Sequence, residues 1–271
     1  MNTLYQQLVG ESLESALQRL ETAIKTRPAD ADLRAAFVQF LALDGNWARA
    51  LTQLKSWRAL KPQAAPTVTL LEQAIEGEQQ REKVLAGQAR PAMPEAQWPW
   101  LTPLASALAQ PDKEASALRL AAFDEAQADP GEYCLEGDDT HAFDWLMDGD
   151  ARFGPVCEAI VNGRYFWLPF TAIALIRFQP PASVTDLIWR HALVQLTDGT
   201  EQVCQIPARY PLAADASDRL KLAKTTEWQP LDDDETLWQG AGQKVWLNDQ
   251  TEIPLLTLSL VTFAAGDDAH E

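Results

Sequence analysis

The stretch "RFGPVCEAIVNGRYFWLPF", residues 152–170, places Asn162-Gly163 between two apolar runs. Both central residues of a type I′ turn need a positive φ, which Asn and Gly tolerate better than other residues. An Asn-Gly pair flanked by apolar runs is therefore a strong signal for a β-hairpin. The stretch predicts that the chain becomes antiparallel β-sheet from about residue 152 onward.

The second apolar run of this hairpin carries large side chains on both faces. Tyr165 and Trp167 point to one side, and Phe166 and Leu168 point to the other, because side chains alternate along a strand. A strand that is apolar on both faces is covered on both faces. We expect the core of the sheet to cover one face and the preceding helical part to cover the other, with a partner protein as the alternative cover.

Further turn signals extend the sheet. Asp198-Gly199 and Asn248-Asp249 each separate two apolar runs, and residues 172–178 supply another strand. This pattern predicts about seven strands joined mostly by tight turns. A small antiparallel sheet, curled or barrel-like, is the expected architecture of this half.

The first 90 residues show helical periodicity and an internal repeat. A shift of 34 residues places Ala16 on Ala50, Leu20 on Leu54 and Pro28 on Pro62. Thirty-four residues is the tetratricopeptide period, in which each unit is a pair of antiparallel helices. Shorter helical patterns follow near residues 101–108 and 114–127. These features predict a short tetratricopeptide-like array.

The predicted fold is therefore α+β, with an N-terminal tetratricopeptide-like helical array followed by a small antiparallel β domain. We place the helical domain at residues 1–128 and the β domain at residues 129–271. Residues 129–150 hold eight acidic residues and no Lys or Arg. A charge run of this kind is usually solvated, so we expect an acidic connecting loop there.

Charge and composition exclude several classes of function. The formal net charge is −17, and all of it arises after residue 95, because the first 95 residues carry equal numbers of acidic and basic groups. Such a chain repels phosphate backbones and anionic lipids, so neither nucleic acid nor membrane is an expected partner. Three Cys residues form no close pair, and no apolar run is long enough to span a membrane. We expect a cytoplasmic protein.

Candidate catalytic groups are sparse. Asp138, Asp139, His141 and Asp144 are the nearest approach to a metal cluster, but their spacing matches no ligand motif and a solvated loop explains them. No G-x-S-x-G nucleophile motif occurs. We therefore expect no enzyme activity, no metal and no cofactor. A hydrolase or metal enzyme that uses the acids of 129–150 is kept as an alternative.

Protein binding is the remaining class of function. Short helical arrays recognise peptides or helices, and aromatic and Arg side chains are the usual anchors. Trp47 occupies a core position of the repeat, whereas Trp57 lies on another face of the same helical pattern and is free for a contact. The candidate partner-binding residues are Arg152, Glu158, Arg164, Tyr165, Trp167 and Trp57. For each of these residues, a place in the core of the fold is the competing interpretation.

Several blocks of the second half resemble a known family. The blocks are "DARFGPVCEAIVNGRYFWLPF", "LIWRHALVQLTDGTEQVCQIPARYP", "LAKTTEW" and "GAGQK", and together with the helical repeats they are similar to the ImpE/TagJ family of SciE-type virulence proteins. One departure is His191, where the family pattern has Pro. Members of this family are accessory components of type VI secretion systems.

The resemblance implies a non-enzymatic cytoplasmic adaptor that binds the small subunit of the contractile sheath, through an N-terminal helix of that subunit. It also implies an indirect link to the AAA+ unfoldase that recycles contracted sheath. The family has no short motif that marks a contact residue. A general tetratricopeptide scaffold with another partner stays open as the alternative function, and the role in sheath assembly or in disassembly is left undecided.

Overall fold

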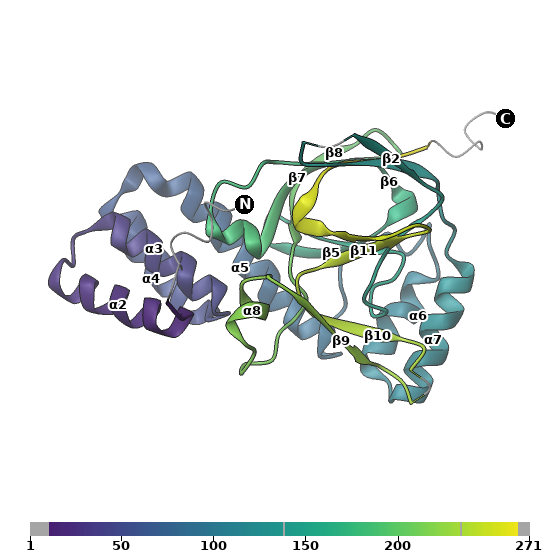
Figure 1. Ribbon diagram of the computed structural model, residues 1–271, viewed down its shortest axis with the longest axis horizontal. Helices are drawn as coiled ribbons and strands as arrows, with labels where there is room; N and C mark the ends of the chain where they lie inside the picture. The colour runs from purple at the N-terminus through teal and green to yellow at the C-terminus, as the bar shows by residue number, and fades with distance from the viewer. Residues whose placement is uncertain (1–10, 138, 234, 265–271) are drawn as a thin grey trace.

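The protein is an α+β chain in which a helical array is followed by antiparallel sheet (Figure 1). A computed structural model describes residues 11–137, 139–233 and 235–264. The helices are α2 (Leu13–Thr26), α3 (Ala31–Leu43), α4 (Trp47–Leu60), α5 (Ala65–Leu85), α6 (Leu101–Ser106), α7 (Asp112–Glu125) and the short α8 (Asp218–Lys221). The change from helix to strand falls between Glu125 and Gly131, and the division into two domains at residue 128 stays a prediction.

The predicted repeat is visible in the helix boundaries. Helices α4 and α5 begin 34 residues after α2 and α3, at Trp47 and Ala65 against Leu13 and Ala31. Asp30 caps α3 because its side chain accepts hydrogen bonds from two backbone amides of the first turn. The connection to α4 turns at Gly45, whose φ of 77° lies in the left-handed region that Gly adopts most readily. The two helical pairs therefore form the tetratricopeptide-like array.

The strands of the main sheet all pair antiparallel, in the order β2-β1-β13-β6-β7-β8-β4-β5. A two-stranded sheet, β10-β9, and a three-stranded sheet, β12-β11-β3, complete the β part. The strands are β1 (Gly131–Leu135), β2 (Thr140–Phe143), β3 (Leu146–Asp148), β4 (Val156–Val161), β5 (Arg164–Pro169), β6 (Ile173–Phe178), β7 (Trp189–Leu196), β8 (Glu201–Pro207), β9 (Thr226–Pro230), β10 (Trp238–Gly242), β11 (Val245–Asn248), β12 (Glu252–Pro254) and β13 (Leu258–Phe263).

The main sheet is not closed into a barrel, because its order has two distinct ends, β2 and β5. It encloses an apolar core in which Phe170 and Phe178 pack on Trp246. The edge of β5 is protected by the linker after α5: the Ala92 amide donates to the Tyr165 carbonyl, and the Ala92 carbonyl accepts from the Trp167 amide. Pairing of this kind removes an exposed strand edge that would otherwise favour aggregation.

The predicted hairpin at Asn162-Gly163 is present between β4 and β5, and both turn residues have positive φ, 49° and 80°. The hairpin from β7 to β8 at Asp198-Gly199 is also confirmed. More strands form than the turn signals indicate, partly because Pro254 and a short 3-10 turn divide the last apolar run into β12 and β13, which belong to different sheets.

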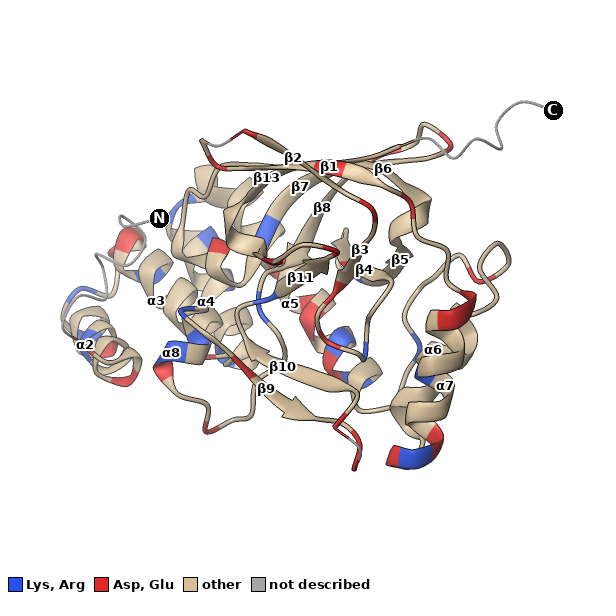
Figure 2. Cartoon of the chain, turned by 45° about the vertical axis from the view of Figure 1, so that its right-hand side comes forward, with Lys and Arg blue, Asp and Glu red and all other residues tan. Residues whose placement is uncertain are grey.

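The prediction of a solvated acidic loop at 129–150 is wrong. This segment contains β1, β2 and β3, and Asp148 and Asp150 at its end are buried. Burial is possible because Lys244, nearly 100 positions along the chain, and Arg152 supply the counter-charges. In Figure 2 both basic (blue) and acidic (red) residues occur on the helices α2 to α4, whereas acidic residues are the commoner kind on the loops of the β part.

Helix α5 covers the hairpin of β4 and β5, as the apolar faces of that hairpin predict. Gln80 donates to the Gly163 carbonyl and accepts from the Tyr165 amide. Gly77 faces Ile160 of β4 so closely that a Cβ built on the glycine would lie 2.4 Å from an Ile160 methyl carbon. The absence of a side chain at Gly77 therefore sets the distance between the helix and the sheet.

We predict that Gly77→Ala lowers the free energy of unfolding. Helix propensity favours the substitution by roughly 0.5–1 kcal/mol, but overpacking in a buried contact costs about 1–3 kcal/mol. The expected net loss is about 1–2 kcal/mol, measured by urea denaturation. Lys83→Ala, an exposed change on the same helix, is the matched control and leaves the midpoint unchanged. An unaltered or raised midpoint for Gly77→Ala contradicts the close packing.

Candidate functional site: a buried charge cluster beside a cleft

A buried carboxylate joins the helical array to the sheet. Glu158 of β4 accepts two hydrogen bonds from Arg81 of α5, over 2.6 Å from Nε to Oε1 and 2.9 Å from Nη2 to Oε2. Both side chains are almost fully enclosed, at 1% and 3% exposed. This two-point geometry is the strongest arrangement that a guanidinium and a carboxylate can form, and it fixes the orientation of both groups.

Lys244 continues the cluster from the loop between β10 and β11. Its Nζ lies 2.8 Å from Glu158 Oε2 and 2.5 Å from Asp148 Oδ2. The hydroxyl of Tyr210 lies 2.8 Å from the other oxygen of Asp148, and the Lys244 ammonium lies 4.5 Å from the centre of the Tyr210 ring. A single lysine thus holds two buried carboxylates from different strands.

Tyr165 and Trp167 complete the environment of Glu158. The Tyr165 hydroxyl donates to Glu158 Oε1, and the Trp167 indole Nε1 donates to the Tyr165 oxygen over 2.7 Å. Because Glu158 lies opposite Trp167, and Ile160 lies opposite Tyr165, all four side chains lie on the face of the hairpin that meets α5. The polar groups of these two aromatic residues are therefore used inside the protein.

Burial and charge act on the carboxylates in opposite directions. Burial raises the pKa of Glu158, but the charges of Arg81 and Lys244 outweigh it and hold that pKa at about 2. The pKa of Asp148 is raised to about 6, because burial outweighs the opposing charge of Lys244, which is shared with Glu158. The negative charges of Asp150 and Glu158 raise this pKa further.

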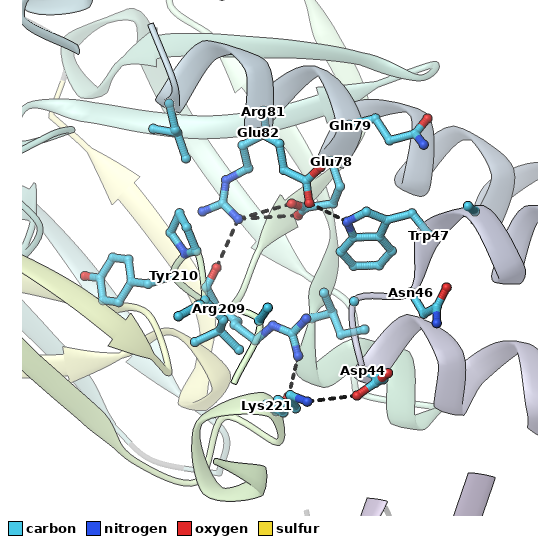
Figure 3. Close-up of a pocket in the computed structure, with 18 residues that line it drawn as sticks. Asp44, Asn46, Trp47, Glu78, Gln79, Arg81, Glu82, Arg209, Tyr210 and Lys221 are labelled. Atoms are coloured by element: carbon cyan, nitrogen blue, oxygen red, sulfur yellow. Dashed lines mark hydrogen bonds and ion pairs between the residues drawn. The ribbon is translucent and has the colours of Figure 1, made fainter. Parts of the chain in front are cut away.

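A cleft of about 720 Å³ opens beside this cluster, where the end of α3 and the helices α4 and α5 meet the segment after β8 (Figure 3). Glu78, Arg81 and Glu82 line it from α5, and Trp47 lines it from the start of α4. The opposite wall lies after β8 and is formed by Arg209, Tyr210, Pro211, Leu212, Ala213, Ala214 and Lys221. Its volume is in the range of sites that accept small ligands or a few side chains.

Aromatic and charged groups form the inner surface of the cleft. The Trp47 indole Nε1 donates to Glu82 over 2.6 Å, and its ring lies 5.8 Å from the Trp189 ring. Glu78 accepts from the Trp189 indole and pairs with Arg81, which links the cleft to the buried cluster. Across the opening, Lys221 pairs with Asp44 over 2.8 Å. The cleft therefore presents a half-buried Trp between polar groups that are mostly paired.

The six predicted partner-binding residues are not gathered on one surface. Glu158, Tyr165, Trp167 and Trp57 are buried. Arg152 pairs with the buried Asp150 over 2.5 Å. Arg164 is exposed, and its guanidinium lies over the Phe166 ring. Binding of a partner by these residues stays a prediction, and the burial of four of them favours the competing interpretation, a place in the core.

The residues that build the cleft were not predicted from the sequence. Trp47 was expected in the core of the repeat, but it is only half buried, packs against the core and lines the cleft. Glu78 and Arg81 could have been found, because they continue the helical stripe that contains Leu71, Ala74 and Ile75. A charged pair on the buried face of a helix indicates partners elsewhere in the fold.

In the alternative hypothesis of a metal site, Asp139 and Asp144 flank strand β2, which contains His141. His141 stacks on Tyr133 with ring centres 5.1 Å apart, and the Asp144 amide donates to Asp249. Asp138 lies outside the described residues. Across residues 11–137, 139–233 and 235–264, no group of three or more His, Cys, Asp or Glu side chains is placed to hold a metal ion.

Comparisons with known proteins identify relatives of the chain. The profile of the family described as "ImpE protein" matches residues 140–262. The "Type VI secretion system accessory component TagJ" of Pseudomonas aeruginosa PAO1 is 36% identical over 261 residues, which covers 94% of this chain and 89% of that protein. The crystal structure of protein VPA1032 from Vibrio parahaemolyticus is also similar, with a TM-score of 0.83 and 26% identity over 97% of this chain and 96% of that one.

We predict that Glu158→Gln destabilises the protein strongly. The change leaves Arg81 and Lys244 buried without their shared counter-charge, and the loss of one partner of a buried pair costs about 3–5 kcal/mol. Chemical denaturation followed by Trp fluorescence measures the effect. Glu201→Gln, a change at an exposed position of β8, is the matched control and leaves stability unchanged. A loss no larger than that of the control would contradict the assigned role of Glu158.

The low pKa of Glu158 also predicts how the destabilisation by Glu158→Gln depends on pH. The folded pKa of Glu158, about 2, lies below its ordinary value of 4.5, so its charge stabilises the fold above pH 4.5. That contribution is lost as pH falls from 4.5 toward 2. The stability difference between the natural chain and Glu158→Gln should therefore be constant near neutrality and shrink across this window. A difference that does not change with pH would show that Glu158 is not held ionised.

Proposed function

Because the chain belongs to the ImpE/TagJ family, we propose that it is an accessory adaptor of a type VI secretion system. The observation that carries this proposal is the 36% identity to a type VI secretion accessory component over 94% of the chain. The aligned region includes both the helical array and the sheet, so the two proteins are similar over both parts of the chain.

We further propose that the adaptor binds the small subunit of the contractile sheath by capturing its N-terminal helix, in the cytoplasm and without catalysis. Paired helices leave rigid grooves that suit an amphipathic helix, which inserts a few side chains as anchors. Within the described part of the chain, no helix is both long and apolar enough to cross a membrane. Through the sheath, the adaptor would be connected indirectly to the AAA+ unfoldase.

The cleft between the array and the sheet supports this function best. It combines a half-buried Trp47 with the apolar segment Pro211 to Ala214 on the opposite wall. Aromatic residues with one polar edge are the commonest anchors of protein interfaces. The Trp47 side chain is already held by its hydrogen bond to Glu82, and Lys221 is held by its ion pair with Asp44. Binding therefore costs little conformational entropy at these side chains.

We predict that Trp47→Ala weakens binding of the purified small sheath subunit at least about 30-fold, because loss of a central aromatic anchor costs about 2 kcal/mol or more. Isothermal titration calorimetry with the full-length chain measures the affinity. Trp145→Ala is the matched control, because Trp145 is equally half buried but lines a separate hollow near α7.

Three outcomes decide between the candidates. Binding that Trp47→Ala weakens and Trp145→Ala leaves intact supports the proposal. If both variants are folded and neither changes the affinity, the interface lies outside the cleft. No binding of the folded natural chain to the sheath subunit would reject the sheath as partner and favour a general scaffold with another partner.

A further inference from the structure

Arg209 is a buried cation that makes no ion pair with an acidic side chain in the part of the chain that the structure describes. Its side chain is 6% exposed and lines the cleft just before Tyr210 (Figure 3). Its Nη1 donates to two backbone carbonyls, those of Leu43 over 2.7 Å and Lys221 over 2.5 Å. No carboxylate of the described residues forms an ion pair with it, whereas the neighbouring Arg81 pairs with two carboxylates and Lys221 pairs with one.

Part of this guanidinium remains open to the cleft. Nε and Nη2 of Arg209 make no hydrogen bond to the described residues, yet neither belongs to the unpartnered polar atoms that are sealed from solvent. These two atoms are therefore in contact with solvent, and the residue lines the cleft. Burial lowers the pKa of Arg209 to about 10, although the charges of Glu78 and Asp44 act against this lowering, so the group is still charged at neutral pH but forms no direct ion pair with them.

The unused pair of donors matches a carboxylate. Nε and Nη2 are one of the two edges with which a guanidinium binds both oxygens of a carboxylate, as Arg81 does to Glu158 in the same protein. A polyphosphate is disfavoured, because Asp44, Glu78 and Glu82 also line the cleft and repel a group with several negative charges. One carboxylate next to apolar side chains fits both the charges and the wall formed by Leu212 to Ala214.

We propose that the cleft binds an amphipathic helix of the partner whose acidic side chain pairs with Arg209 while its apolar side chains contact Trp47 and Leu212. This inference rests on the proposed function and adds to it the chemistry of the bound helix. Arg209 selects partners that carry an acid at the matching position, because a helix without that acid leaves the guanidinium buried and unpaired.

The test is a double-mutant cycle with the full-length chain and the purified small sheath subunit. Arg209→Met removes the charge, and single Asp→Asn and Glu→Gln changes along the N-terminal helix of the subunit remove each acid in turn. Arg219→Met, an exposed change on the nearby α8, is the matched control. We expect Arg209→Met and one acid change each to weaken binding at least about 30-fold. The two changes together should cost no more than one alone.

Other results overturn the inference in distinguishable ways. If the natural chain binds, and folded Arg209→Met binds equally well, the carboxylate pairing is wrong while the proposed function stands. If Arg209→Met does not fold, the acid series against the natural chain decides, and an affinity that no single acid change weakens rejects the pairing. Absence of binding by the natural chain rejects the proposed function, and this inference with it.

Discussion

The ion pair between Arg81 and Glu158 is the interaction on which the arrangement of the chain depends. It joins the second helical pair to the hairpin of β4 and β5 in a region that water does not reach. Replacing such a pair by apolar residues of equal volume is often neutral, so its value lies less in net stability than in the geometry that it requires. Neither charge can be buried without the other, which means that helix and hairpin must dock in one register.

Lys244 extends this requirement to the C-terminal part of the sheet. Because it serves both Glu158 and Asp148, the loop before β11 must be in place before either carboxylate is fully compensated. The docked arrangement then brings Trp47 and Glu82 opposite Tyr210 and Lys221, and the cleft is the space left between them. The buried cluster is thus the structural support of the cleft, the surface that we assign to partner binding.

Local signals in the sequence predicted the elements well where the backbone alone decides them. Asn162-Gly163 marked its hairpin because few residues tolerate two successive positive φ angles, and the 34-residue period marked the helical pairs because each unit repeats the same packing. Both signals act over short distances along the chain, so they can be recognised without knowledge of the fold.

The charged interior could not be predicted in the same way. Asp148 and Asp150 were interpreted as part of a solvated loop because the counter-charge of Asp148 comes from Lys244, far along the chain. Glu158 and Tyr165 were predicted as partner-binding residues, and their polar groups are used within the fold: Glu158 accepts from Arg81, and the Tyr165 hydroxyl donates to Glu158. The cleft could not be predicted from the sequence for a related reason. Trp47, Glu82 and Arg209 come from three segments that only the tertiary fold brings together.

Amide hydrogen exchange of the chain, with and without the small sheath subunit, tests the central claim most directly. If the sheath subunit binds in the cleft, binding slows exchange at residues 44–48, 79–85 and 209–214, the segments that line it, and leaves the outer strands of the sheet unchanged. Slower exchange confined to the strands around the exposed Val203, with no change at the cleft, would contradict it.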